Sequence, residues 1–332
     1  MSLTLIPCPL CGESHQRLAL RVPYHDDHIA DYGSLYGSQT KSEWKACGTC
    51  GFVHQNPRPS AKALNEFYSA GEYHATATPP AWTQEAKYMK FARWYYDDKV
   101  AYAVANTIPR GRVFDMGFGY GGVLKLFAER GLGVAGREPD PRLAAFARET
   151  LGLVGPEQGL VEADMGRTAP VDLVFSNHAF EHVADLHAVM MGLRSIMKPG
   201  GHIFTVVPTY ASNRSSMSLR WMNSAHYSLF TRASLNQMMA RYGFEPVTST
   251  YRGWRKEIDD VWHLARYTGK SIDPTQFYEE PDQVARFVNW VNPVRSLLFA
   301  PVFANYGKKV QRVLYVQEGL KLVARRLLGR ET

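Results

Sequence analysis

The sequence lacks the long apolar runs and the leader pattern that direct a protein into or across a membrane. No stretch reaches about 18 uninterrupted apolar residues, which argues against a membrane-spanning helix. The first residues, MSLTLIPCPLCGESH, contain no basic n-region, no extended apolar core and no small-residue cleavage site. Hydrophobic residues make up 45% of the chain and charged residues 21%, as in a folded globular protein. We therefore expect a cytoplasmic protein.

Cysteine is scarce, and the four cysteines form two C-x-x-C pairs, each followed by glycine: Cys8 with Cys11, and Cys47 with Cys50. Thiolates at this spacing converge on one ion, and two such pairs complete the tetrahedral site of a structural zinc. The alternative is a pair of redox dithiols or disulfides, which a cytoplasmic location disfavours. No cysteine remains to act as a nucleophile elsewhere.

Most of the chain carries no excess of either charge. The formal net charge is +7, and residues 285–332 alone hold nine basic and two acidic side chains, so the remainder is close to neutral. A basic tail can meet nucleic acid, a phosphorylated substrate or a lipid surface, and the alternative is a solvated helix face. The apolar spacing of residues 313–327 fits peripheral membrane contact. The same spacing also fits a helical cap or a dimer contact, and we prefer this second interpretation.

Strand-like and helix-like patterns alternate through the middle of the chain. The expected strands lie at 113–116, 133–137, 160–163, 171–176 and 203–207. Helices are expected between several of them, at 121–130, 141–150 and 183–197. This alternation predicts an α/β fold in which helices cover both faces of a parallel sheet.

The composition divides the chain into four segments. They are a zinc-ribbon module at 1–60, a helical linker or cap at 61–108, the α/β domain at 109–255, and a basic helical extension at 256–332. Ser60 and Thr231 precede helix-like patterns and are expected to cap them.

The stretch VFDMGFGYGGVL at 113–124 places glycines directly after the first expected strand. Gly117, Gly119 and Gly122 satisfy G-x-G-x-x-G, which alone is weak evidence for a dinucleotide site. Glu138 ends the second expected strand, where an acid accepts the hydroxyls of an adenosine ribose. NAD and S-adenosylmethionine both offer that ribose. Asp115 favours S-adenosylmethionine, because this ligand carries an ammonium and a sulfonium and no phosphate.

The motifs VFDMGFGYGGVL, GREPDP, ADM, VDLVFSNHAFEHV and MKPGG occur in the order and spacing of class I S-adenosylmethionine-dependent methyltransferases, which residues 110–250 resemble. The resemblance implies a doubly wound Rossmann-like methyltransferase sheet. It also implies donor contacts at six positions, which are Asp115, Gly117, Gly119, Glu138, Asp164 and Asn177. The N-terminal C-x-x-C module, NPRPS and FYSAGEYH resemble bacterial methyltransferases of nucleotide-sugar, glycan and secondary-metabolite pathways. Sugar C-methyltransferases of that group carry a second large domain, whereas only about 80 residues follow position 250 here.

Methyl transfer to a hydroxyl requires a base for the acceptor proton. The candidates are His178 and His182 in SNHAFEHV and His226 in NSAHYSLF. Ubiquinone-pathway O-methyltransferases use acids and a histidine in the first segment, so His178, Glu181 and His182 are also a conceivable divalent-metal set. The same residues match the zinc-peptidase pattern H-x-x-E-H, but a zinc peptidase has this motif within a helix.

Two further absences exclude classes of methyl acceptor. The chain has no N/D-P-P-Y motif after the fourth strand, which argues against amino-group methylation of bases, and no spare cysteine for methylation at a pyrimidine carbon. It also lacks interleaved aromatic and basic residues that stack bases. We therefore expect methyl transfer to a small polar acceptor, with an oxygen preferred over nitrogen or carbon. The alternatives are an rRNA or tRNA methyltransferase, an NAD oxidoreductase, and a zinc-dependent binding protein with a vestigial methyltransferase domain.

Overall fold

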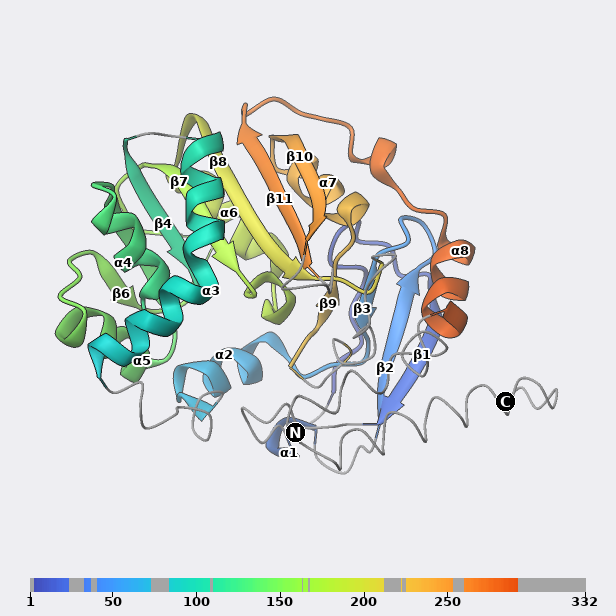
Figure 1. Ribbon diagram of the computed structural model, residues 1–332. Coiled ribbons are helices and arrows are strands. Elements are labelled where there is room, and N and C mark those ends of the chain that lie inside the picture. The colour runs from blue at the N-terminus through green and yellow to red at the C-terminus, as the bar shows by residue number, and fades with distance from the viewer. Residues whose placement is uncertain are drawn as a thin grey trace.

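The computed structural model in Figure 1 describes most of the chain. The described residues are 3–23, 33–36, 41–72, 84–107, 110–162, 164–166, 168–211, 222, 225–252 and 260–291. Every candidate site residue named above falls within these ranges. The residues of 292–332, on which the membrane and cap alternatives depend, lie outside them.

A seven-stranded sheet forms the centre of the α/β domain. In spatial order its strands are β10 (Phe244–Arg252), β11 (Asp260–Tyr267), β8 (Met197–Pro208), β7 (Val171–Asn177), β4 (Arg112–Met116), β5 (Gly133–Glu138) and β6 (Pro156–Gln158). Strands β4 to β8 are parallel to one another, because crossover connections rather than hairpins join them. Strand β11 is antiparallel to both of its neighbours. The doubly wound, Rossmann-like sheet is confirmed, and one strand in it is reversed.

The reversed strand extends the sheet past residue 255, where the sequence predicts the α/β domain to end. It pairs with β8 from Asp260 opposite Pro208 to Arg266 opposite His202, so it is an inner strand. Residues 260–267, within the segment expected to be a helical extension, therefore form a strand. A 3₁₀ turn at Pro274–Phe277 and helix α8 (Pro281–Arg286) follow it.

The strand predicted at 160–163 is wrong for residues 160–162, and residue 163 lies outside the described residues. Strand β6 lies earlier in the chain, where it pairs with β5 through Gly136 opposite Pro156. Gly155 permits this pairing, because a Cβ at that position would lie 2.3 Å from the carbonyl oxygen of Val134. The chain has left the sheet by Leu160, whose carbonyl oxygen accepts a hydrogen bond from the Arg137 side chain.

Helices cover both faces of the sheet (Figure 1). One face carries α3 (Glu85–Asn106), α4 (Gly122–Glu129) and α5 (Pro141–Ala145), which a π-helical turn at Phe146–Thr150 continues. The other face carries α6 (Leu186–Ile196) and α7 (Arg232–Arg241). Side chains of β7 alternate between the two: Leu173 and Phe175 pack toward α3 and α4, whereas Val174 packs toward α6.

The two predicted caps are confirmed. The Ser60 hydroxyl accepts a hydrogen bond from the Ala63 N–H at 3.2 Å and begins α2 (Ala61–Ser69). The Thr231 hydroxyl accepts from the Ser234 N–H at 3.0 Å and begins α7. Each cap satisfies a backbone donor that has no partner inside its helix.

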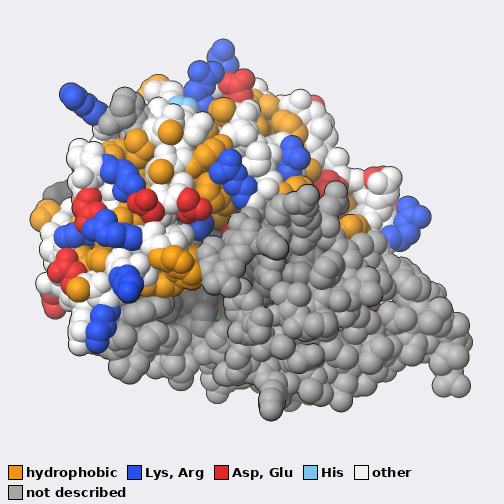
Figure 2. All heavy atoms as spheres, in the orientation of Figure 1, with side chains coloured by type: hydrophobic (Ala, Val, Ile, Leu, Met, Phe, Trp, Pro, Cys, Tyr) orange, Lys and Arg blue, Asp and Glu red, His pale blue; other side chains and the backbone are white. Residues whose placement is uncertain are grey.

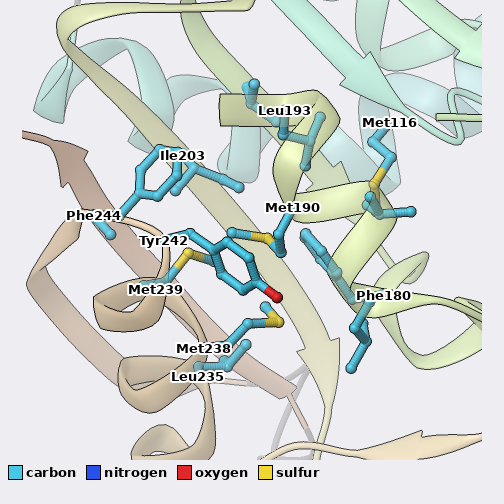
Figure 3. Packing of buried hydrophobic residues seen from close by; sticks show 14 of the residues in the cluster. Met116, Phe180, Met190, Leu193, Ile203, Leu235, Met238, Met239, Tyr242 and Phe244 are labelled. Atoms are coloured by element: carbon cyan, nitrogen blue, oxygen red, sulfur yellow. The ribbon is translucent and has the colours of Figure 1, made fainter. Parts of the chain in front are cut away.

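The core on the second face is built from α6, α7 and β8 (Figure 3). Met190 of α6, Met238 of α7 and Ile203 of β8 point into it, together with Phe180 from the turn after β7. Phe180 is fully buried, which contributes roughly 1.5–3 kcal/mol to the free energy of unfolding. The same cluster includes Cys8, Cys47 and Cys50, so this core is continuous with the cysteine module.

A second, four-stranded sheet holds the N-terminal module. Its order is β1 (Gln16–Pro23), β2 (Lys41–Cys47), β3 (Val53–Gln55) and β9 (Ser228–Leu229). All neighbours are antiparallel. Strand β9 comes from a distant part of the chain, and beside it the Gln55 N–H donates to the Tyr227 carbonyl oxygen at 2.9 Å. The module is therefore joined to the α/β domain by backbone pairing.

The surface over α3, α4 and α5 carries basic and acidic side chains side by side (Figure 2). Arg93 pairs with Glu129 at 2.6 Å, and Arg130 pairs with Asp97 at 2.6 Å. Exposed pairs of this kind contribute about 0–1 kcal/mol each. This face therefore has no uniformly basic area. Among the described residues, no helix combines the length and the apolar character needed to cross a bilayer.

Candidate functional site

The glycine turn between β4 and α4 has the left-handed backbone that glycine adopts freely. Gly117 has φ 70° and Gly119 has φ 55°. A Cβ at Gly117 would lie 3.2 Å from the Cβ of Ala179, so this turn packs closely against the segment after β7. No atom lies within 4 Å of a Cβ built at Gly119. The turn is therefore tight on one side and open at Gly119.

Glu138, at the end of β5, is bound to the glycine turn. Its Oε2 accepts a hydrogen bond from the Gly119 N–H at 2.9 Å, and its Oε1 accepts from the Asp140 N–H at 3.0 Å. The side chain is buried, and burial raises its pKa to about 7 despite the two backbone donors. This carboxyl group thus changes charge near neutral pH.

Asp115, in β4, is the second buried acid at this edge of the sheet. It is 2% exposed. Burial raises its pKa well above the usual range, and the charge of Glu138 raises it further. Because both carboxyl groups resist ionisation together, a cationic ligand between them would stabilise their charged forms. The sequence prediction that these two acids share one site is consistent with this coupling.

The two remaining predicted donor contacts differ in their surroundings. Asn177 ends β7 opposite Val206, next to β4 in the sheet, and its Oδ1 is buried without a hydrogen-bond partner among the described residues. Asp164 is exposed in the loop after β6, and its carboxylate accepts the Gly166 N–H at 2.7 Å. No hydrogen bond joins Asp164 to Glu138 in the described part of the chain.

His178 follows β7 in a strained backbone conformation, with φ 51° in the left-handed region. Its own N–H donates to the Val206 carbonyl oxygen at 2.8 Å, which holds the turn. The imidazole Nε2 lies 3.2 Å from Oδ1 of Asp260, and Nδ1 lies 3.6 Å from Oε1 of Glu181. Burial lowers the pKa of His178, but Asp260 and Glu181 outweigh it and raise the pKa above its usual value.

His182 and His226 lie next to each other and close to Glu181. The His182 Nδ1 lies 3.0 Å from the Ala225 carbonyl oxygen and 3.2 Å from the Tyr68 hydroxyl. The rings of His182 and His226 meet edge to face with centroids 4.7 Å apart. Burial raises the pKa of Glu181 to about 7. The fold therefore gathers all three candidate histidines around one buried carboxyl group.

The four cysteines converge as their spacing predicts. The Sγ atoms of Cys8 and Cys50 are 3.7 Å apart, those of Cys11 and Cys47 are 3.4 Å apart, and all four cysteines are free of disulfides. A tetrahedral zinc with bonds of about 2.3 Å separates its sulfurs by about 3.8 Å, so the thiols fit this ion. All four ligand atoms lie within 4.8 Å of one another. The sequence grouping of these cysteines is confirmed, and zinc itself remains a prediction.

Sequence reasoning missed two residues that contact the histidines. Asp260 opens β11, and the only hint of it is an acidic pair just before the apolar run VWHLARY. Because β11 is antiparallel, its first residue lies at the edge where the parallel strands end. Tyr68, at the end of α2, reaches His182 from 114 positions away, and no local pattern marks that contact.

Comparisons with known proteins agree with this architecture. Residues 88–249 match the family model described as "Methyltransferase domain". A trans-aconitate 2-methyltransferase of Rhizobium etli is 28% identical over 206 residues, which cover 60% of this chain and 72% of that protein. The C-methyltransferase NovU of Streptomyces niveus is 26% identical over 146 residues, which cover 41% of this chain and only 33% of that protein.

Solved structures align with parts of the chain at lower identity. An S-adenosylmethionine-dependent methyltransferase from Mesorhizobium loti superimposes with a TM-score of 0.42 at 16% identity, over 53% of this chain and 97% of that one. The matched residues 88–249 contain the glycine turn, Glu138 and all of β7 and β8. The family model therefore identifies residues 88–249 as a methyltransferase domain.

Proposed function

We propose that the chain transfers the methyl group of S-adenosylmethionine to an oxygen of a small polar acceptor, such as a sugar nucleotide, a glycan intermediate or a secondary metabolite. One observation carries the proposal: Asp115, Glu138 and the pair of His178 with Asp260 all lie at the edge of the sheet where the parallel strands end. Relatives that are named for small acceptors support it. The relative that is named a C-methyltransferase makes carbon the competing acceptor atom.

The donor side of the proposed site follows from β4 and β5. Glu138 would accept the ribose hydroxyls, with its oxygens already oriented by the N–H groups of Gly119 and Asp140. The open space above Gly119 leaves room for the adenosyl group. Asp115 would face the positive charge of the donor, and Asn177 its amino-acid end. Asp164 is the proposed partner of the adenine amino group. When bound, the donor supplies a methyl group already activated by the sulfonium.

The acceptor side follows from His178. Its Nε2 lies 3.2 Å from Oδ1 of Asp260, and its Nδ1 lies 3.6 Å from Oε1 of Glu181. Nδ1, the ring nitrogen away from Asp260, would take the acceptor proton while the acceptor oxygen displaces the sulfur in line. The S–CH₃ bond breaks, the O–CH₃ bond forms, and S-adenosylhomocysteine leaves. Asp260 then stabilises the imidazolium. His182 and His226 would line the acceptor side.

The cysteine cluster is proposed to bind one structural zinc through Cys8, Cys11, Cys47 and Cys50. Four thiolates leave no open coordination position, so this ion would hold the module together and take no part in methyl transfer. The Thr49 N–H donates to the Cys47 sulfur at 3.4 Å, as expected for a backbone amide that supports a metal-bound thiolate.

Two measurements test the function. Isothermal titration with S-adenosylmethionine and S-adenosylhomocysteine should show binding below millimolar concentrations. A release assay for S-adenosylhomocysteine with a panel of nucleotide sugars, hydroxy acids and phenols should then identify an acceptor, and product NMR should locate the methyl on oxygen. Methylation at carbon or nitrogen would contradict the base mechanism. Absence of donor binding would instead favour the vestigial domain.

A further inference from the structure

Arg58 is a buried cation that the described residues do not pair with an acid. It follows β3 in the segment NPRPS and is 5% exposed. Its Nη2 donates to the Ala184 carbonyl oxygen, whereas its Nη1 is buried and has no hydrogen-bond partner among the described residues. Asp185 attracts the guanidinium through space, but this carboxylate is exposed and caps α6 by accepting the Ala188 N–H at 3.0 Å.

The charge of Arg58 persists in spite of its burial. Burial lowers the pKa of this guanidinium to about 10, so the group still carries its proton at neutral pH. A buried charge is costly unless it is paired and hydrogen-bonded. An anion that reaches Nη1 would supply both the missing acceptor and the missing negative charge.

The polar groups around Arg58 can also donate to an anion. The Tyr227 ring lies beside the guanidinium, with 5.9 Å between Cζ and the ring centroid. Tyr36, the last residue of α1 (Gly33–Tyr36), donates its hydroxyl to Oε1 of Gln55 at 2.9 Å. The Nε2 of the same amide is buried and has no hydrogen-bond partner in the part of the chain that the structure describes. Because Tyr36 and Tyr227 both act electrostatically on Arg58, these groups form one cluster that lacks acceptor oxygens.

This cluster adjoins the proposed acceptor side. The carbonyl group that accepts from Arg58 is two residues beyond His182, and Tyr227 directly follows His226. The Tyr68 hydroxyl connects the two regions, because it lies 3.2 Å from Nδ1 of His182 and interacts with the Tyr227 side chain. Arg58 therefore lies where it can contact a part of the acceptor that extends beyond these histidines.

We propose that Arg58 binds a carboxylate or phosphate group of the methyl acceptor and so selects anionic acceptors. This inference rests on the proposed function and names the chemical class of its substrate. A guanidinium has planar, fixed donors that match the paired oxygens of either group, and a low local dielectric strengthens the bond. Arg58 would fix one end of the acceptor and leave the reacting oxygen to His178. The N-terminal module would then contribute directly to acceptor recognition.

Anion binding tests the site without a known acceptor. In thermal melts of the full-length chain at constant ionic strength, chloride is replaced stepwise by inorganic phosphate or by malonate, which gives a dissociation constant for each anion. At least one of the two should raise the Tm, and the tighter one identifies phosphate or carboxylate as the bound group. Arg58→Gln should weaken its binding at least about tenfold, because charge-assisted hydrogen bonds are lost. Arg58→Lys keeps the buried charge without the planar fork, so it should fold and show a smaller loss.

Arg21→Gln is the matched control and should leave both dissociation constants unchanged. This arginine also belongs to the N-terminal module, but its side chain is 52% exposed and pairs with Glu43 at 2.9 Å. Equal anion affinity in Arg58→Gln and the unmodified chain would overturn the proposal. So would melts of the unmodified chain that respond to phosphate and malonate no more than to chloride.

Paired acceptors separate this inference from the proposed function. In the S-adenosylhomocysteine release assay, sugar phosphates are compared with free sugars, and hydroxy acids with their amides. Arg58→Gln should raise KM at least about tenfold for the charged member of a pair and leave its kcat nearly unchanged, because uniform binding is lost. Methyl transfer to neutral and charged acceptors with equal KM would refute only the role of Arg58. Anion binding that depends on Arg58 in a chain that binds no donor would refute only the proposed function.

Discussion

Replacement of Glu138 by glutamine tests the donor site most sharply. Each carboxylate oxygen accepts one backbone N–H, from Gly119 at 2.9 Å and from Asp140 at 3.0 Å. Glutamine keeps one acceptor oxygen and turns an NH₂ group toward the other donor. The variant therefore loses one charge-assisted bond to the ribose and weakens the second. Such bonds contribute roughly 1.5–3 kcal/mol each.

A loss of about 2–3 kcal/mol corresponds to donor affinity roughly 30- to 150-fold weaker, since 1.4 kcal/mol is a factor of ten. Isothermal titration at pH 8 should show this loss for S-adenosylmethionine and S-adenosylhomocysteine alike, because both carry the ribose. Glu157→Gln is the matched control. That side chain lies on the adjacent strand β6 and is 66% exposed, so its donor affinity should be unchanged.

The pH dependence gives an independent check of the same residue. Burial raises the pKa of Glu138 to about 7, and the ionised form is the one that accepts the ribose hydroxyls. Protons therefore compete with the donor. Affinity should rise as the pH increases through about 7, by up to about tenfold per unit below that value, and then level off. The donor affinity of the Glu138→Gln variant should not show this rise with pH. Equal donor affinity in the variant and the unmodified chain at pH 8 would refute the assignment of Glu138 to the ribose.

Four other changes separate the remaining roles. Gly119→Ala should weaken donor binding at least tenfold. Gly152→Ala is its control, because Gly152 has φ +65° and equally open surroundings; this variant should keep its donor affinity and lose only about 1–2 kcal/mol of the free energy of unfolding, from backbone strain, in chemical denaturation. Asp115→Asn should weaken donor binding in calorimetry while zinc content stays constant, and an unchanged dissociation constant would count against its role. Asp260→Asn should lower kcat about 10²- to 10³-fold with the donor dissociation constant intact, and a change confined to KM would speak against a role beside the base. Removal of metal with a strong chelator should lower the Tm by at least about 5 °C in a thermal melt, and an unaltered melt would argue against structural zinc.

The features that could be predicted from sequence are those with a local pattern. Alternating strands and helices predict the doubly wound sheet, and an acid at the end of a strand predicts Glu138 beside the glycine turn, because parallel strands end at one edge. Paired C-x-x-C spacing predicts that the cysteines converge. Each of these signals depends on neighbours within a few residues.

The unpredicted features depend on pairing between distant segments. Strand β9 has two residues, too few for any periodicity, yet it completes the sheet of the cysteine module. Strand β11 has no marker of its reversed direction, so Asp260 could not be placed beside His178. His226 meets His182 across 44 positions because the Glu181 carbonyl oxygen accepts the Tyr227 N–H at 2.8 Å. Only the folded chain brings these groups together.

The insertion of β9 into the N-terminal sheet has a consequence for biosynthesis. During translation the first three strands leave the ribosome long before residues 228–229 are made, so the backbone groups at the free edge of β3 stay unpaired until then. A truncated protein that begins after position 60 would leave the opposite partner exposed in the same way. We therefore expect the N-terminal sheet and the α/β domain to complete their folding together.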